Sequence, residues 1–221
     1  MEILQLILAT LGGYLLGSFP SGLVYVRLFT GKDVREVGSG RTGGTNAMRA
    51  GGFWIGFLTA MSDILKGTLA VWLAQWLLPA GWLQEWGMVL SGLASILGHN
   101  YPVWLNFKGG AGGATCAGAA IGFWPWMLPI VFIEGAIILY FVGYASVATI
   151  LTAITVTGVL AYLAYIGALS WTFVWFGVGA TFLLAYALRP NFARLMKGEE
   201  RLVGLRAKRK AAREAAGVKN P

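Results

Sequence analysis

The chain has 221 residues, of which 57% are hydrophobic and only 12% are charged, and it carries a formal net charge of +8. Soluble domains contain about twice this charged fraction, so the composition excludes an ordinary soluble globular domain. The apolar blocks are continuous and do not alternate, which excludes a β-barrel and predicts an all-α polytopic membrane protein. The single cysteine, Cys116, excludes an internal disulfide and a cysteine-based metal cluster.

The first apolar stretch, residues 3–26, contains no charged residue and exceeds the roughly 20 residues that cross a bilayer. It is too long for the apolar core of a signal peptide and no basic residue precedes it, so we expect a retained transmembrane helix. The later apolar stretches predict six more helices, at residues 53–78, 86–105, 111–123, 126–142, 146–166 and 170–188.

The basic residues orient these helices. Residues 27–49 contain five Lys or Arg, and residues 189–221 contain ten against three Glu, so the positive-inside rule places both segments in the cytoplasm. An even number of helices must then lie between them, and six satisfies this. The sequence predicts about seven transmembrane helices, with the N-terminus outside and the C-terminus cytoplasmic.

The predicted organisation is one transmembrane domain over residues 1–188, with cytoplasmic loops at 27–52 and 106–115. A basic cytoplasmic tail follows at 189–221. The start of the tail mixes apolar and basic residues, as short amphipathic helices on an anionic leaflet do. We expect residues 207–221 to be a solvated extension.

The segment "GSGRTGGTNAMR", residues 38–49, combines glycines with two cations and several neutral hydrogen-bonding groups. Arg41 and Arg49 can each offer a planar fork to phosphate oxygens, and Ser39, Thr45 and Asn46 add polar side chains. Glycines let the backbone approach a ligand and turn its N–H groups inward. The segment predicts an anion site, although the same composition also fits an ordinary flexible loop.

A second glycine-rich segment, "FKGGAGGAT", covers residues 107–115 and leads into an apolar helix. Unpaired N–H groups and the dipole at a helix N-terminus attract anions, so Lys108 and its glycines form a second candidate phosphate loop. The alternative is close packing of small residues between helices, which leaves Lys108 unexplained.

Three further features carry ionisable groups. His99 is the only histidine, and it could act as a general base, orient a substrate hydroxyl or serve structure alone; a metal site is not expected. Asp63 and Lys66 lie three residues apart on one helical face, either as a functional pair or as a packing pair. Asn191, Arg194 and Glu200 could fold back onto a site or remain at the membrane surface.

Together these segments predict a cytoplasmic site for a substrate that is part phosphate and part acyl chain. The ordered set "GSFPSG", "GSGRTGGTNAMR", "SDILKG", "GHNYPVW", "FKGGAGGAT" and "NFARLMKGEE" resembles the bacterial acyl-phosphate-dependent glycerol-3-phosphate acyltransferases over nearly the whole chain. The resemblance implies a seven-helix inner-membrane enzyme with its active site facing the cytoplasm. Such an enzyme moves an acyl group from acyl phosphate to the 1-hydroxyl of glycerol 3-phosphate, giving lysophosphatidic acid and phosphate.

The resemblance also implies site residues, and it implies no metal, no cofactor and no nucleic-acid partner. Ser39, His99 and Asn191 are expected to be catalytic. The expected partners are glycerol 3-phosphate, long-chain acyl phosphate and membrane lipid. Substrate binding is expected of Arg41, Thr45, Asn46, Arg49, Lys108, Gly109, Gly110, Gly112, Thr115 and Glu200.

The chain departs from the family pattern at two positions. Arg41 stands where the family usually has Asn, and Ala111 stands where it usually has a second Lys. If the two loops face each other, the exchange conserves charge around one phosphate. The alternatives are a divergent paralogue with another donor or acceptor, a small transporter of a phosphorylated solute, and a structural membrane protein.

Overall fold

The computed structural model describes residues 1–216, and these residues form a helical bundle with short connections. The main helices agree closely with the expected apolar stretches. The helices are α1 (Glu2–Ser18), α2 (Ser21–Thr30), α3 (Gly44–Gly51), α4 (Phe53–Leu77), α5 (Trp82–Asn100), α6 (Gly113–Phe123), α7 (Met127–Phe141), α8 (Ala145–Tyr165), α9 (Thr172–Ala187), α10 (Arg189–Met196) and α11 (Gly204–Ala215), with short 3-10 turns at Val34–Glu36 and Val103–Leu105.

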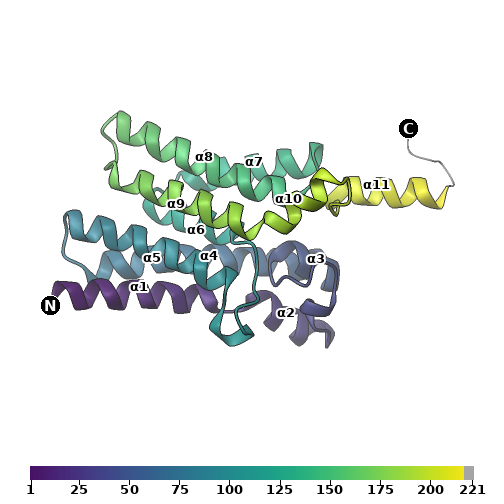
Figure 1. Cartoon of the computed structure of the whole chain (residues 1–221), viewed down its shortest axis with the longest axis horizontal. Coiled ribbons are helices and arrows are strands. Elements are labelled where there is room, and N and C mark those ends of the chain that lie inside the picture. The colour runs from purple at the N-terminus through teal and green to yellow at the C-terminus, as the bar shows by residue number, and fades with distance from the viewer. Residues whose placement is uncertain (217–221) are drawn as a thin grey trace.

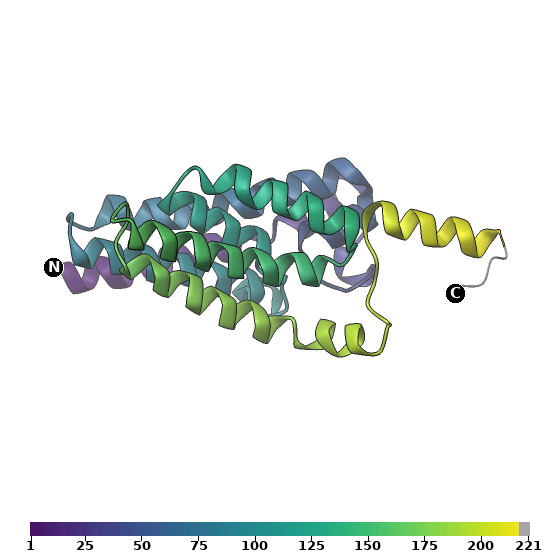
Figure 2. The same cartoon turned by 90° about the horizontal axis from the view of Figure 1, so that it is seen from above.

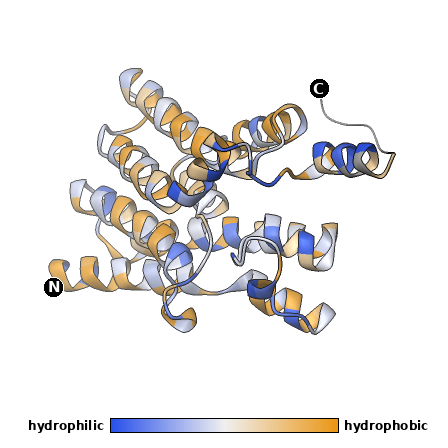
Figure 3. Ribbon diagram, turned by 45° about the vertical axis from the view of Figure 1, so that its right-hand side comes forward, coloured by the Kyte–Doolittle hydropathy of each residue, from blue (hydrophilic) through white to orange (hydrophobic). Residues whose placement is uncertain are grey.

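The long helices run roughly parallel to one axis, and the polar elements gather at one end of it. The N-terminus lies at the opposite end from α2, α3 and α11 (Figures 1 and 2). Helix α1 packs against α4 and α5, α4 packs against α6, and α8 packs against α9. Hydrophobic residues dominate the N-terminal end, whereas hydrophilic residues cluster toward the end that bears α11 (Figure 3).

The bundle core draws buried side chains from α1 and from α4 to α9. Their buried side chains include Val71 of α4, Ile96 of α5, Leu160 of α8 and Phe176 of α9. A smaller cluster around Val26 joins α2, α3 and the start of α4. This second cluster fixes the polar end of the molecule to the bundle.

Three helical segments among the described residues are long and apolar enough to cross a membrane: Glu2–Thr30, Phe53–Leu77 and Ala145–Tyr165. A fourth is added if Thr172–Ala187 and Arg189–Met196, which are bent by 60°, count as one span. The described chain therefore shows a membrane protein with three or four clear spans. The expected total of seven stays a prediction.

The first apolar stretch is interrupted where the sequence suggested one continuous helix. Helix α1 ends at Ser18 and α2 begins at Ser21, with Pro20 as the residue before α2. Proline lacks the N–H that a helix interior needs and clashes with the preceding turn, which explains the break. The carbonyl of Phe19 at this break accepts from the N–H of Ser21 at 3.0 Å and from Lys66 Nζ at 3.1 Å.

Two segments expected to be irregular are helical. Residues 44–51, within the expected loop 27–52, form α3, whose start follows extended backbone at Gly43. Residues 204–215 form α11, so the solvated extension expected from residue 207 is helical over most of its length. Residues 217–221 of that extension lie outside the described part of the chain.

Helix α6 is too short to cross the bilayer. Its 11 residues span about 16 Å at 1.5 Å per residue, roughly half of the 30 Å hydrocarbon core. Its N-terminus must therefore begin inside the bundle rather than at its end. The glycine-rich segment before it reaches inward, toward the site described next.

Candidate active site

A cavity of about 170 Å³ opens among the polar elements, large enough for several water molecules at about 30 Å³ each. Six parts of the chain line it: residues 39–49, α4, the end of α5, the start of α6, the start of α8, and residues 188–201. Of the expected site residues, it brings together Ser39, Arg41, Thr45, Asn46, Arg49, His99, Gly112, Asn191 and Glu200.

Asn46 holds the first glycine-rich segment in shape. Its amide nitrogen donates to the carbonyls of Val34, Val37 and Arg41 at 2.8–2.9 Å, and its Oδ1 accepts from the N–H of Ser39 at 3.0 Å. Because every polar atom of this buried side chain is engaged by backbone, the structure gives Asn46 a supporting position. It presents Ser39 and Arg41 to the cavity.

Two of the cavity arginines lie in or beside that segment. Arg41 donates to the carbonyl of Ala187, at the end of α9, at 2.6 Å. Burial lowers the pKa of Arg41 and so does nearby Arg194; burial and Arg201 lower the pKa of Arg49 in the same way. Guanidinium groups remain charged despite such shifts, so Arg41 and Arg49 are buried cations that a bound anion would stabilise.

Arg194 and Arg201 also line the cavity, so it has four arginines against Asp63 and Glu200. Arg194 was already a candidate from the sequence. No spacing pattern singled out Arg201, which approaches only because the chain folds back after α10. The cavity therefore carries surplus positive charge and suits a phosphorylated ligand.

Glu200 fastens the segment after α10 against the bundle. Its Oε1 accepts from Asn191 Nδ2 at 2.7 Å and from Ser146 Oγ at 3.5 Å, and its Oε2 accepts from Arg194 Nε at 3.0 Å. The Oδ1 atom of Asn191 is buried and has no hydrogen-bond partner within residues 1–216. Glu200 thus orients Asn191 and leaves one of its atoms for a ligand.

Most of the second glycine-rich segment lies outside the cavity lining. Lys108 is exposed and lies outside the cavity lining. Asn106 and Phe107 adopt positive φ angles of 50° and 60°, and this tight turn carries Lys108 outward. Lys108, which the sequence predicts to bind substrate, therefore does not face the cavity in this structure.

The residues that follow Lys108 make contacts with other parts of the backbone. The N–H groups of Gly109 and Gly110 donate to the carbonyls of Asn100 and His99 at 3.1 and 2.9 Å. They therefore cap the C-terminal end of α5, where carbonyls lack helical partners. Thr115 is fully buried outside the cavity lining, and its backbone carbonyl packs closely against Gly67 of α4. Of this segment's expected residues, only Gly112 lines the cavity.

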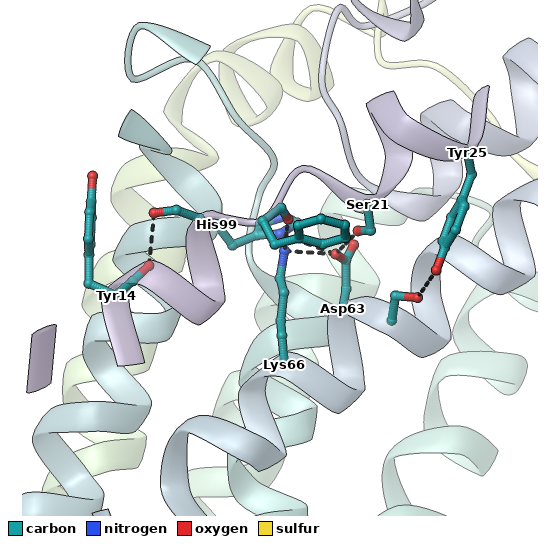
Figure 4. Close-up of polar contacts among 9 residues, drawn as sticks. Tyr14, Ser21, Tyr25, Asp63, Lys66 and His99 are labelled. Carbon is teal, nitrogen blue, oxygen red and sulfur yellow. Dashed lines mark hydrogen bonds and ion pairs between the residues drawn. The ribbon is translucent and has the colours of Figure 1, made fainter. Parts of the chain in front are cut away.

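His99 and Asp63 line the cavity, and Asp63 is contacted by Ser21 and Lys66, which lie outside the cavity lining (Figure 4). Asp63 Oδ1 lies 3.5 Å from His99 Nδ1, accepts from Ser21 Oγ at 2.6 Å and pairs with Lys66 Nζ at 2.9 Å. Spacing identified Asp63 and Lys66 as a pair. Ser21 could not be identified, because its approach depends on the break after α1.

No group of three or more His, Cys, Asp or Glu side chains is placed to hold a metal ion within residues 1–216. The side chains that line the cavity supply cations, two carboxylates, neutral hydrogen-bonding groups and one imidazole. Small residues at the starts of α6 and α8, including Ala111, Gly113 and Ala145, form a more apolar wall.

Comparison with known proteins yields one family. A family model described as glycerol-3-phosphate acyltransferase matches residues 7–198. A glycerol-3-phosphate acyltransferase of Anaeromyxobacter sp. (strain Fw109-5) is 38% identical over 201 residues, covering 90% of this chain and 96% of that protein. Another, of Staphylococcus aureus (strain Newman), is 40% identical over 202 residues, covering 89% and 97%.

The fold is similar to crystal structures of an integral membrane glycerol 3-phosphate acyltransferase. Its glycerol 3-phosphate form matches with a TM-score of 0.78 and 32% identity, covering 90% of this chain and 96% of that one. Its lysophosphatidic acid form matches with a TM-score of 0.75 and 30% identity, covering 90% and 95%.

Proposed function

The chain belongs to the glycerol-3-phosphate acyltransferase family, and on that basis we propose that it acylates glycerol 3-phosphate in a membrane. The acyl donor is acyl phosphate, and the products are lysophosphatidic acid and inorganic phosphate. The observation that carries the proposal is the arginine-rich cavity recessed among apolar helices. Such a site can hold a phosphorylated, water-soluble substrate beside a lipid-borne acyl chain.

The reaction needs little covalent chemistry from the protein, because acyl phosphate is an activated mixed anhydride. The 1-hydroxyl oxygen of glycerol 3-phosphate attacks the acyl carbonyl carbon, the bond from that carbon to the phosphate oxygen breaks, and the hydroxyl proton passes to a phosphate oxygen. Positioning of the two substrates and neutralisation of their charge supply most of the rate enhancement.

The cavity residues divide these tasks. Arg41 and Arg49 hold phosphate, Ser39 and His99 orient the attacking hydroxyl, and Asn191 uses its unpartnered Oδ1 on a bound hydroxyl. Ser21 donates to Asp63 and makes no hydrogen bond to His99, so this cluster lacks the activated nucleophile of acyl-enzyme catalysis. Transfer is therefore direct.

We place the cavity on the cytoplasmic side of a bacterial inner membrane, with seven spans. Six are formed by α1, α4, α5, α7, α8 and α9, and the seventh by the short α6 together with the glycine-rich segment that precedes it. The N-terminus at the end opposite to α3 and α11 supports this orientation (Figure 1), as do the basic residues of the cavity end. In this arrangement residues 1–188 form the membrane domain and residues 189–221 the cytoplasmic tail. Glycerol 3-phosphate then enters from the cytoplasm.

The test uses purified protein with radiolabelled glycerol 3-phosphate and, in separate reactions, acyl phosphate, acyl-CoA or acyl carrier protein. We expect labelled lysophosphatidic acid from acyl phosphate alone. Product only from another donor would refute the assigned donor, and no product from any donor would refute the activity. An acyl-protein trapped during turnover would refute direct transfer.

One observation favours a second candidate, a family member with altered donor or acceptor preference. Arg41 and Ala111, the two departures from the family pattern, both line the cavity. The donor series above and a parallel series of phosphorylated polyols distinguish this candidate. Flux of labelled glycerol 3-phosphate into sealed liposomes without product would instead indicate transport.

A further inference from the structure

Asp63 and His99 face each other at the inner wall of the cavity, and both side chains are almost completely buried. Asp63 is 1% exposed and His99 5%, and Asp63 Oδ1 lies 3.5 Å from His99 Nδ1 (Figure 4). Ser21 Oγ and Lys66 Nζ hold the same Oδ1 atom at 2.6 and 2.9 Å. The carboxylate is thus fixed from two sides before it meets the imidazole.

Lys66 is itself anchored, because it also donates to the carbonyl of Phe19 at the break between α1 and α2. The positive charge of Lys66 balances the negative charge of Asp63. A protonated His99 would add a second buried cation with no further anion in contact within residues 1–216, and an uncompensated buried charge is costly. His99 is therefore expected to be neutral, with one ring nitrogen as donor and the other as acceptor.

The carboxylate decides which nitrogen carries the proton. A hydrogen on Nδ1 points at Asp63 Oδ1, whereas a bare Nδ1 would place two lone pairs against each other. The other nitrogen, Nε2, faces Gly110, where an added Cβ would collide with it, and lies 4.0 Å from a Cβ placed on Gly43. Gly43 and His99 both line the cavity, so Nε2 is the ring atom presented to a ligand.

We propose that Asp63 is a positioning residue for acyl transfer: it holds His99 as the neutral Nδ1–H tautomer, so that Nε2 accepts a hydrogen bond from a hydroxyl of glycerol 3-phosphate. The inference rests on the proposed function for the identity of the hydroxyl. The tautomer itself follows from the Asp63–His99 geometry. Ser21 and Lys66 keep the carboxylate in place for this role.

His99 is the only histidine, so selective ¹⁵N-histidine labelling gives one pair of ring signals and allows a direct test by NMR. The wild-type protein should show a protonated Nδ1 and a bare Nε2, and adding glycerol 3-phosphate should shift the Nε2 signal. A protonated Nε2 in the wild type would overturn the proposal. So would an unshifted Nε2 in protein that binds glycerol 3-phosphate.

Asp63→Asn keeps the shape of the side chain but can present its amide N–H₂ to Nδ1. We expect signal for the Nε2–H tautomer and a fall in kcat of roughly 10²-fold, with a much smaller change in KM for glycerol 3-phosphate. A folded variant with the wild-type tautomer and kcat would overturn the proposal. If this variant fails to fold, the wild-type spectrum still tests the tautomer. Asp63→Glu, which retains the carboxylate, then serves as the second variant.

Asp33→Asn is the matched control, because Asp33 is paired with Arg35 and lies outside the cavity lining. It should leave both tautomer and kcat unchanged. A purely structural role for Asp63 predicts lower stability with no change of tautomer, which the spectrum separates from positioning. If the wild type shows the expected tautomer but gives no product, the proposed function fails while the tautomer assignment stands.

Discussion

The two glycine-rich segments, residues 38–49 and 107–115, have similar compositions but different roles in the structure. The first turns Arg41 and Arg49 toward the cavity, while the second sends Lys108 away from it. Glycine permits close approach of backbone to any neighbour, whether ligand or protein. Composition alone therefore does not identify a phosphate loop.

The difference lies in where the backbone N–H groups go. In the second segment Gly109 and Gly110 use theirs on the last carbonyls of α5, so these donors are unavailable to an anion. In the first segment the side chain of Asn46 satisfies the loop carbonyls instead. The second segment thus holds the end of α5 that carries His99, and the first segment lines the cavity.

The largest expected contrast compares the cations of the two segments. Arg49→Ala removes a charged contact to phosphate worth about 1.5–3 kcal/mol, so kcat/KM for glycerol 3-phosphate should fall about 10- to 100-fold. Lys108→Ala removes an exposed charge outside the cavity and should change kcat/KM less than about twofold. Steady-state kinetics with purified variants measure both, and equal losses would refute the distinction between the segments.

A second contrast compares their glycines. Gly110→Ala would place a methyl group against the His99 ring, and such overpacking destabilises by about 1–3 kcal/mol. Gly43→Ala meets nothing nearer than His99 Nε2 at 4.0 Å and should leave stability unchanged. Thermal unfolding in detergent measures this difference. An unchanged melting temperature for Gly110→Ala would show that the second segment does not close on His99.

The helices were predictable because length and continuous apolar composition are local properties of the sequence. The expected stretches at residues 53–78 and 146–166 correspond to α4 (Phe53–Leu77) and α8 (Ala145–Tyr165). The break at Pro20 carried a local signal that the apolar pattern masked. Helix α3 had no such local sequence signal, because it is held in place by the hydrogen bonds of Asn46 and by packing against α4.

Residues of the candidate site could be predicted from the sequence only where the residue type itself indicates a chemical role. Arg41, Arg49 and His99 reached the cavity as expected, whereas the positions of Lys108 and Thr115 depended on how two helix ends meet. Ser21 and Arg201 approach from distant segments. Their contributions depend on tertiary contacts that no spacing in the sequence encodes.

A third test returns to the two departures from the family pattern. Arg41→Asn removes one cavity cation and its hydrogen bond to Ala187, so KM for glycerol 3-phosphate should rise about 5- to 10-fold, or roughly 1 kcal/mol. Ala111→Lys in the same protein places a cation at another point of the same cavity lining and should recover most of this loss. Strictly additive effects of the two changes would contradict compensation.

The smallest expected effect concerns the ion pair between Asp33 and Arg35, which precedes the first segment. Arg35, which donates to Asp33, holds the pKa of that carboxyl down at about 2, against an ordinary value of 3.8. A lowered folded-state pKa means that the ion pair stabilises the protein above about pH 4 and that this contribution is lost as the pH falls toward 2.

The Asp33 and Arg35 side chains are 19% and 44% exposed, so solvent screening limits the pair to less than about 1 kcal/mol. Asp33→Asn should lower the melting temperature slightly at pH 6, and the difference from wild type should vanish near pH 2. Acyl transfer should be unaffected, because this pair lies outside the cavity lining. A loss of activity in this variant would show that residues back to position 33 contribute to acyl transfer although they lie outside the cavity lining.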